Sequence, residues 1–222
     1  MRFYKHFGDA LNELRRDVSE LGVRVHPQTM QDKDISDDPD YLTKEYTNQI
    51  FTVTQPRLED LHPTQPWADA EFQERISYVG LNSGEAWKLR PEVWQEFHDR
   101  GFGYTYGERY ETSLDAIISE LRTHPDSRQL WLGVWHPEQD AHVLGKRRVP
   151  CSVGYWFNLR RGLLGITYIQ RSADIATHFE NDIYLTHKLQ RYIAAEAEVE
   201  VGLYTHWIGS LHAYAKDVAG SF

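Results

Sequence analysis

The sequence predicts one α+β domain, because helical periodicity prevails in the first half of the chain and strand periodicity in the second. With 222 residues, 41% of them hydrophobic, the chain is long enough to bury one sizeable core. Apolar residues at helical spacing are frequent in the first half, and β-branched alternating segments are frequent in the second. Without an internal repeat or a low-complexity tract, residues 1–222 are expected to form a single domain.

In the first half, the helices are expected at residues 7–21, 68–79, 91–99 and 112–123. Asp9 can cap the first helix and Gly22 ends it, and Ser113 can cap the last. Residues 31–46 are acidic and lack periodicity, which is typical of a surface loop. Residues 50–54 are β-branched and alternating, which predicts a strand.

In the second half, the strands are expected at residues 130–135, 151–159, 164–170 and 202–207. Arg160-Arg161-Gly162 separates two of them and predicts a hairpin turn. Residues 183–197 fit a buried helix. One mixed sheet flanked by helices would accommodate all these elements.

Charge and composition exclude several classes of protein. A net charge of −9 argues against a polymeric nucleic acid as partner, since such proteins present a basic surface. No apolar run approaches the roughly 18–20 residues of a membrane span, and no signal-peptide pattern starts the chain. The single cysteine allows no internal disulfide, which suggests a cytoplasmic protein.

Cys151 is a candidate nucleophile, although a lone cysteine is more often a small buried hydrophobic residue. It follows Lys146-Arg147-Arg148 and Pro150. Nearby cations lower the pKa of a thiol and favour the nucleophilic thiolate. At least one of these three basic residues is expected to lie in a solvated loop instead.

Two further segments carry candidate ligand-binding groups. Gln170-Arg171-Ser172-Ala173-Asp174 combines a guanidinium and a hydroxyl, which suit a phosphate, although a surface ion pair between Arg171 and Asp174 is the alternative. His212 and Tyr214 alternate, so in a strand they face one side and could bind a sugar hydroxyl or simply be half-buried. The histidines show no metal-ligand spacing, and no metal is expected.

The order of these motifs resembles the thymidylate synthase family. In that family a Pro-Cys nucleophile, here Pro150-Cys151, precedes Gln-Arg-Ser-x-Asp, here residues 170–174, and then a His-x-Tyr ribose clamp, here His212 and Tyr214. The resemblance implies the family fold, with a sheet face used for dimerisation. It also implies nucleotide binding by Gln170, Arg171 and Ser172, and folate binding near Asp174.

Upstream segments extend the resemblance. Arg128 matches an arginine that crosses to the phosphate of the partner subunit, so the resemblance implies a homodimer. Trp94 resembles the tryptophan that borders the folate, and Tyr106 matches a tyrosine that organises water and proton transfer. Glu74 matches a glutamate that also organises water and proton transfer in the family. The alternative is that Glu74 is an exposed glutamate on a helix. The implied co-substrate is 5,10-methylenetetrahydrofolate.

Asp182 narrows the implied substrate. At this position thymidylate synthases carry an asparagine that reads uracil. This chain instead resembles the phage deoxycytidylate hydroxymethylases in two segments, His-Phe-Glu-Asn-Asp at residues 178–182 and Gly209-Ser210-Leu211-His212. A carboxylate accepts hydrogen bonds from the amino group of cytosine and from a protonated N3, whereas an amide suits the mixed edge of uracil. Asp182 could also cap a helix that begins near Ile183.

The resemblance implies that the Cys151 thiolate adds to C6 and that C5 then takes the methylene group from the folate. Addition of water completes a hydroxymethyl group on dCMP. The alternatives are methylation of dUMP or dCMP, and a nucleotide-binding relative without catalysis. Two departures from the family pattern are Gln129, where a second phosphate-binding arginine is usual, and Ser152, where a histidine often follows the nucleophile.

Overall fold

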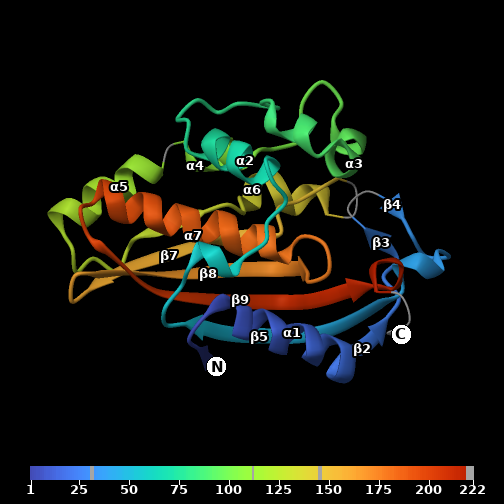
Figure 1. The fold of residues 1–222 in the computed structure, drawn as a ribbon. Coiled ribbons are helices and arrows are strands. Elements are labelled where there is room, and N and C mark those ends of the chain that lie inside the picture. The colour runs from blue at the N-terminus through green and yellow to red at the C-terminus, as the bar shows by residue number, and fades with distance from the viewer. Residues whose placement is uncertain (31–32, 112, 145–146, 219–222) are drawn as a thin grey trace.

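The computed structural model describes residues 1–30, 33–111, 113–144 and 147–218 (Figure 1). The helices are α1 (Phe7–Leu21), α2 (Trp67–Arg75), α3 (Pro91–Trp94), α4 (Tyr106–Tyr110), α5 (Leu114–Thr123), α6 (Pro137–Asp140) and α7 (Phe179–Glu196). The strands are β1 (Arg2–Tyr4), β2 (Val23–Val25), β3 (Thr29–Met30), β4 (Lys33–Asp34), β5 (Thr43–Val53), β6 (Trp131–Gly133), β7 (Ser152–Arg160), β8 (Leu163–Asp174) and β9 (Glu200–Tyr214). Short 3-10 turns join several elements, among them η3 (Ala86–Leu89) and η4 (Gln95–Phe97).

Seven strands form one mixed sheet in the order β1-β5-β9-β8-β7-β6, with β2 also paired to β5. β1 and β5 are parallel, as are β8 and β9, whereas the other pairs in this sheet are antiparallel. β3 and β4 form a small sheet of their own. A large mixed sheet with flanking helices confirms the predicted α+β class.

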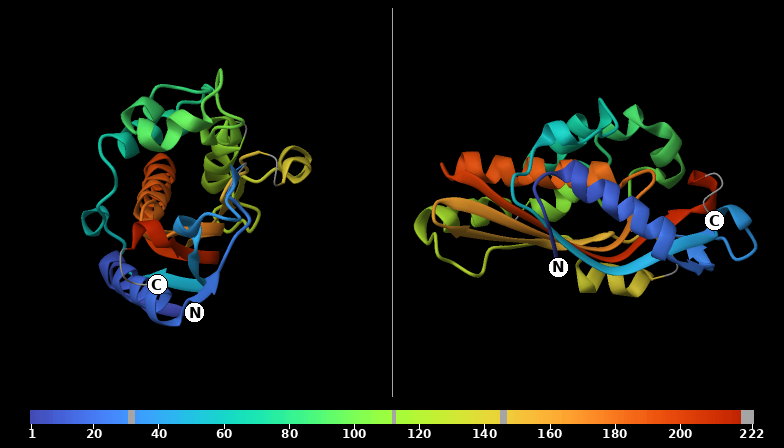
Figure 2. Two further views of the ribbon diagram at one scale, coloured as in Figure 1. Left: turned by 90° about the vertical axis from the view of Figure 1, so that its right-hand side faces the viewer. Right: turned by 60° about the horizontal axis from the view of Figure 1, so that its bottom comes forward.

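The helices and the sheet enclose the hydrophobic core. α7 lies on the sheet, between it and the segment that contains α2 and α4 (Figure 1, Figure 2). Leu185, Leu189 and Ile193 of α7 follow one another at helical spacing and are buried. α1 packs nearby, where the ring of Phe7 meets that of Tyr204 in β9 with centroids 5.0 Å apart. No helix in the described residues is both long and apolar enough to cross a membrane.

The β8–α7–β9 unit determines where a ligand can bind. Because β8 and β9 are parallel, their carboxyl ends lie at the same edge of the sheet. Asp174, which ends β8, is paired in register with His212 of β9. α7 begins after a turn at residues 175–178, so its N-terminal end lies at this edge as well. The carboxyl edge of parallel strands is a common position for ligand sites.

The hairpin expected at Arg160-Arg161-Gly162 is confirmed, since β7 and β8 pair antiparallel around it. Arg161 and Gly162 have φ values of 55° and 77°. A positive φ at both central residues gives a two-residue turn whose twist matches the strands. At the far end of this hairpin Ser152 lies opposite Gln170, which brings Cys151 to the carboxyl edge of β8.

The expected surface loop at residues 31–46 is wrong at its C-terminal end. β5 begins at Thr43 and pairs with β9 as far as Tyr214, and Lys33–Asp34 forms β4. Pairing with a long neighbouring strand overrides the weak local strand pattern of this segment. Residues 31–32 lie outside the described part of the chain.

Other boundaries also differ from those expected. α2 ends at residue 75, α3 is a single turn continued by η4, and Thr112 lies outside the described residues. Asp9 lies in the first turn of α1 rather than capping it, and Ser113 precedes α5 without a side-chain capping bond. α7 begins at Phe179, four residues before the expected start. Asp182 is therefore inside the first turn and is not the helix cap.

Candidate active site

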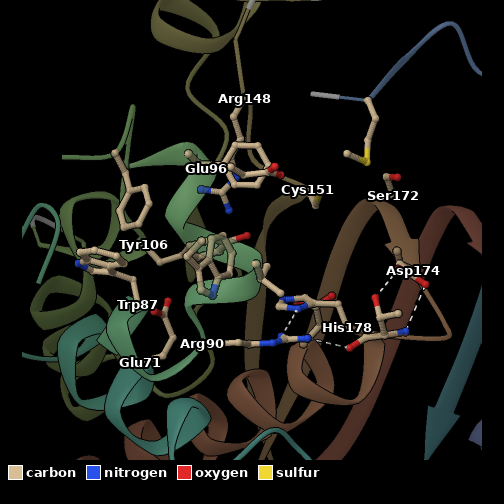
Figure 3. Close-up of a pocket in the computed structure, with 18 of the residues that line it drawn as sticks. Glu71, Trp87, Arg90, Glu96, Tyr106, Arg148, Cys151, Ser172, Asp174 and His178 are labelled. Atoms are coloured by element: carbon tan, nitrogen blue, oxygen red, sulfur yellow. Dashed lines mark hydrogen bonds and ion pairs between the residues drawn. The ribbon is translucent and has the colours of Figure 1, made fainter. Parts of the chain in front are cut away.

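A cavity of about 730 Å³ opens at the carboxyl edge of β8 and β9. Ser172 and Asp174 enter it from β8, whereas Glu71 and Trp87 enter from the opposite wall (Figure 3). Its volume is in the range of pockets for small molecules. Eleven of the predicted site residues line it: Glu74, Trp94, Tyr106, Cys151, Gln170, Arg171, Ser172, Asp174, Asp182, His212 and Tyr214.

Arg171 holds the backbone around Cys151. The Arg171 amide donates to the carbonyl oxygen of Cys151 at 2.8 Å, and its Nε donates to the carbonyl oxygen of Pro150 at 2.8 Å. Its Nη2 lies 3.9 Å from the Cys151 sulfur. One guanidinium thus fixes the segment that carries the thiol and places a positive charge next to it.

Neighbouring cations lower the pKa of Cys151, as expected for Arg148, but the net pKa of the thiol is raised. Burial raises the pKa of the thiol, and Asp182 raises it further, whereas Arg171 and Arg148 lower it. The cost of desolvating a thiolate outweighs the attraction of the two guanidinium groups. Arg147 is exposed, and Lys146 lies outside the described residues.

Asp182 belongs to a row of buried polar groups beneath the cavity. Its Oδ2 accepts a hydrogen bond from Nε2 of Gln170 at 2.7 Å. Oε1 of Gln170 in turn lies 3.0 Å from Nε2 of His206, and both of these side chains are buried. Burial raises the pKa of Asp182 to about 7, although the Gln170 bond and the charge of Arg75 oppose this rise. Asp182 can therefore hold or release a proton near neutral pH.

Two carboxylates of α2 face the cavity. Oε1 of Glu74 accepts from the backbone N–H groups of Glu85 at 2.5 Å and Ala86 at 2.8 Å, so it closes the start of η3 and is not a free exposed glutamate. Glu71, one turn earlier, accepts from Nε of Arg75 at 2.8 Å. The sequence reasoning did not identify Glu71, because its spacing is that of any surface glutamate on a helix.

Tyr106 is held by a cation and by a hydroxyl chain. The guanidinium carbon of Arg75 lies 3.9 Å from the centre of the Tyr106 ring. The Tyr106 hydroxyl lies 2.9 Å from Oγ of Ser152, which lies 2.5 Å from the hydroxyl of Tyr168. Burial raises the pKa of Tyr106 well above its usual value, so the hydroxyl stays protonated. Ser152 thus links Tyr106 to the sheet directly beside Cys151.

Aromatic side chains form the wall opposite the sheet, with Trp87, Trp94, Phe97, Phe102 and Tyr104 as members. The indole N–H groups of Trp87 and Trp94 are buried and have no hydrogen-bond partner among the described residues. The guanidinium of Arg148 lies 4.6 Å from the ring centre of Trp94 and 4.9 Å from that of Tyr104. A flat heterocycle with polar edges fits such a wall.

The strand ends supply the remaining predicted groups. The rings of His212 and Tyr214 face the same side, as expected, with centroids 5.0 Å apart. Asp174 turns the chain from β8 toward α7: its Oδ1 accepts from the amide of Ala176 at 2.9 Å, and its Oδ2 accepts from the Thr177 hydroxyl. These contacts stabilise the turn that positions the start of α7.

Arg128 does not line the cavity of its own chain. It is exposed before β6, and its carbonyl oxygen accepts a hydrogen bond from the indole of Trp156 at 3.3 Å. In addition to Glu71, the sequence reasoning did not identify Arg75, Arg90 and His178 as site residues. The contact between Arg90 and His178 joins residues distant in the sequence, and the i,i+4 pairs of Arg75 with Glu71 and of His178 with Asp182 have a spacing common on any helix.

Within the described residues, no group of three His, Cys, Asp or Glu side chains is arranged to hold a metal ion. The groups that line the cavity include a thiol, carboxyl groups, guanidinium groups and aromatic rings.

Comparison with known proteins agrees with this arrangement. Residues 58–220 match the family model for thymidylate synthase. A protein of Methanocaldococcus jannaschii, provisionally named a thymidylate synthase, is 30% identical over 174 residues, or 78% of this chain and 76% of its own length. A protein of Methanothermobacter thermautotrophicus with the same provisional name is 30% identical over 190 residues, or 82% of this chain and 83% of its own.

Thymidylate synthase A from Bacillus subtilis has a similar fold, with a TM-score of 0.72 over 95% of this chain and 80% of that protein. Sequence identity in this comparison is 21%, so it supports the fold. The matched residues include Cys151, the carboxyl edge of the parallel strands and the aromatic wall. The chain therefore belongs to the thymidylate synthase family.

Proposed function

We propose that this protein is a dCMP 5-hydroxymethyltransferase, which transfers a one-carbon unit to C5 of the pyrimidine. The observation that carries this choice of base is the carboxyl group of Asp182 in the cavity lining, hydrogen-bonded to Gln170 at 2.7 Å. The resemblance of the motifs places Asp182 where thymidylate synthases carry the asparagine that reads uracil. An acidic side chain there changes which base edge is complementary.

The hydrogen-bonding edges of the two bases explain the choice. Uracil presents an acceptor at position 4 and a donor at N3, which match the two ends of an amide. Cytosine presents an amino donor at position 4, and one proton shared between its N3 and Asp182 completes a second bond. A pKa of about 7 allows Asp182 to bring that proton and to give it to N3, which leaves a carboxylate that accepts from both donors of the base. A mismatched buried edge costs about 1–3 kcal/mol, which is enough to set a preference.

Cys151 is the proposed nucleophile toward C6 of the ring. A new bond forms between Sγ and C6, and the electron pair of the C5–C6 double bond makes C5 a carbon nucleophile. Tyr106 stays protonated beside Ser152 and can donate to a water or a leaving group there. After C5 takes the methylene group, loss of the C5 proton and of tetrahydrofolate leaves an exocyclic methylene. Glu74 lines the same cavity and can orient the water that adds to this methylene. The bond between Sγ and C6 then breaks, which restores the C5–C6 double bond and frees Cys151.

The proposed phosphate and sugar sites lie on the sheet. Arg171 and Ser172 offer a guanidinium and a hydroxyl to a phosphate, and His212 and Tyr214 face the cavity where a ribose would lie. The one-carbon unit is supplied by 5,10-methylenetetrahydrofolate, the co-substrate of this family. The aromatic wall around Trp94, with its unpartnered indole N–H, fits the folate ring system.

A homodimer is proposed through the sheet face opposite α7. Ile50 and Ile169 flank Trp207 in register, and Leu203 lies two rows along on the same face. Ile50 is 37% and Leu203 49% exposed, and such a row across three strands is typical of an interface. Arg128 would then reach the phosphate site of the partner subunit.

Thymidylate synthesis is the second candidate, because the archaeal relatives carry that provisional name. In that case dUMP is the substrate and the folate also donates a hydride to give a methyl group. Methylation of dCMP is a third possibility within the same chemistry. A nucleotide-binding relative without catalysis would keep the pocket but make no product.

Product mass separates these candidates. The protein is incubated with 5,10-methylenetetrahydrofolate and either dCMP or dUMP, and the nucleotide is weighed by mass spectrometry. Hydroxymethyl-dCMP without dihydrofolate is expected. A methyl product together with dihydrofolate would establish synthase activity instead. Release of tritium from C5 should be lost in Cys151→Ala, and its survival there would contradict the covalent mechanism.

A further inference from the structure

Arg90, His178 and Asp182 form a line of polar contacts that ends at the cavity. Nη1 of Arg90 lies 2.9 Å from Nδ1 of His178, and its Nη2 donates to the carbonyl oxygen of Thr177 at 3.2 Å (Figure 3). Nε2 of the same histidine lies 3.5 Å from Oδ1 of Asp182. Oδ2 of Asp182 faces the amide of Gln170, so the histidine and the glutamine approach different oxygens.

The contact with Arg90 fixes the proton on His178. A guanidinium has only donors, so Nδ1 of the imidazole must accept, and the single ring proton is then on Nε2. Burial together with Arg90 lowers the pKa of His178 to about 3, which keeps the ring neutral. His178 therefore presents an N–H group, and not a lone pair or a full positive charge, to Asp182.

Aromatic packing fixes the plane of the ring. The His178 ring lies 5.6 Å from Trp67 and 6.0 Å from Trp94, measured between centroids. Arg90 is itself buried, with its guanidinium carbon 5.3 Å from the centre of the Trp67 ring. The N–H direction toward Asp182 is therefore determined by the packing of three elements, and a local rotation cannot readily change it.

We propose that Arg90 and His178 are positioning residues for base selection: through its Nε2–H, His178 keeps Oδ1 of Asp182 a hydrogen-bond acceptor. This inference rests on the proposed function of Asp182 as the group that reads the base. Neither Arg90 nor His178 needs to touch the nucleotide. Their effect on the substrate passes through the carboxyl group.

The expected consequence concerns the edge that Asp182 presents. With Gln170 donating to Oδ2 and the N–H of His178 3.5 Å from Oδ1, the ionised carboxylate suits a base that brings two donors, as cytosine protonated at N3 does. Without His178, Oδ1 can carry a proton. A protonated acid has one donor and one acceptor, and it matches uracil as well as neutral cytosine. Loss of His178 should therefore move the preference from dCMP toward dUMP.

Other charged and titratable groups around Asp182 must be taken into account in any pH experiment. They are Arg75 of α2, Arg90 before α3, Cys151 before β7, Tyr168 and Asp174 of β8 and Tyr204 of β9. Asp174 opposes ionisation of Asp182, whereas Arg75 and Arg90 favour it. None of these groups is replaced in the variants below, apart from Arg90 and Asp182 themselves.

The test is a double-mutant cycle. Values of kcat/KM for dCMP and dUMP are measured for the wild type, His178→Phe, Asp182→Asn and the double variant at pH 6, 7 and 8. Phenylalanine keeps the ring between the tryptophans and removes the N–H group. One polar contact of about 1 kcal/mol corresponds to about a five-fold fall in the dCMP/dUMP ratio. In the Asp182→Asn background the same replacement should change the ratio less than about two-fold.

A matched control is His187→Phe, which removes another buried histidine of α7, 3.0 Å from Gln190 and outside the cavity lining. It should leave the ratio unchanged. An equal effect of His178→Phe with and without the Asp182 carboxyl group would overturn the inference, as would an unchanged ratio. If His178→Phe does not fold, Arg90→Met is used as the second test variant. It frees Nδ1, so the ratio should become pH-dependent below about pH 6.5, the usual range of a histidine.

A titration of the carboxyl carbon of Asp182 by ¹³C NMR separates failure of this inference from failure of the proposed function. The inflection should move to higher pH in His178→Phe, whichever nucleotide the enzyme uses. An unmoved inflection refutes the positioning role. A wild type that ignores dCMP, or an Asp182→Asn variant with unchanged preference, refutes base reading by Asp182 instead.

Discussion

Removal of the Asp140 carboxylate should destabilise the fold and disturb the tyrosines of the candidate active site. Asp140 ends α6 and forms an ion pair with Arg109 of α4, with 2.8 Å between Oδ1 and Nη2 and 4% exposure of both side chains. Its Oδ2 accepts the backbone N–H of His136 at 2.7 Å. The Arg109 guanidinium carbon lies 5.5 Å from the centre of the Tyr104 ring, in the cavity wall.

The magnitude follows from what each replacement leaves behind. Asp140→Ala leaves a buried guanidinium without its counter-charge, and removing one partner of a buried pair costs about 3–5 kcal/mol. For a chain of this size each kcal/mol lowers Tm by about 2–4 °C, so Tm should fall by roughly 6–20 °C. Asp140→Asn keeps the shape and one acceptor but loses the charge, and should cost about 1–3 kcal/mol.

Denaturant unfolding of five variants tests this reasoning: Asp140→Ala, Asp140→Asn, Arg109→Met, the double variant Arg109→Met with Asp140→Ala, and Asp126→Ala. Arg109→Met combined with Asp140→Ala should be more stable than Asp140→Ala alone, because no buried charge is left unpaired. Asp126→Ala is the exposed control. Asp126 is 97% exposed and lies 3.9 Å from Arg160, so its loss should change the free energy of unfolding by about 0.5 kcal/mol or less. A loss below about 1 kcal/mol for Asp140→Ala, or simple additivity in the double variant, would refute it.

Two further predictions concern titrating groups. Burial raises the pKa of Cys151, so its alkylation by iodoacetamide should accelerate up to alkaline pH. Arg171 lowers this pKa, so Arg171→Gln should slow alkylation at any fixed pH near neutral. An unchanged alkylation rate in Arg171→Gln would contradict this role of Arg171. The pKa of Asp182 is raised to about 7, so the native state binds this proton more tightly than the unfolded chain does. The protonated carboxyl group therefore contributes its full stability below about pH 4, and this contribution is lost as pH rises to about 7. Asp182→Asn should therefore gain on the order of 2–4 kcal/mol relative to the wild type between these limits, and a difference in Tm that does not widen with pH would contradict this.

Local patterns in the sequence were sufficient for the parts of the fold that depend on neighbouring residues. The hairpin turn at Arg161-Gly162 needed only a turn residue between two alternating runs. The full length of β5 was missed, because residues from Thr43 on become a strand by pairing with β9, up to Thr43 opposite Tyr214. The start of α7 was placed too late for a related reason: Phe179 is helical and buried because it packs on the sheet.

The residues of the candidate site also differ in whether a local sequence pattern could identify them. Cys151 and Arg171 belong to motifs, so the sequence could mark both as candidates for the cavity that they line. Arg90 and His178 are in contact although they are 88 positions apart in the sequence, so no local spacing could predict this contact. The pKa of Cys151 could not be inferred either, because the number of nearby cations is visible in a sequence but the burial that outweighs them is not.

Gln170 and His178, the two side chains next to Asp182, are each held with an N–H group toward it by a further polar contact. Tyr204 lies 3.4 Å from Nδ1 of His206, and a hydroxyl that donates there leaves the imidazole proton on Nε2. That proton faces Oε1 of Gln170, so the amide must turn its nitrogen toward Asp182. On the other side of Asp182, the Arg90 guanidinium donates to Nδ1 of His178, so the ring proton of His178 is on Nε2 and points toward Asp182. An amide in place of Asp182 would need one of its neighbours to accept, and neither can do so without breaking a contact behind it. These hydrogen-bonding neighbours thus favour the ionised carboxylate, in opposition to the burial that raises the pKa of Asp182, and this argues for a base edge that supplies the donors.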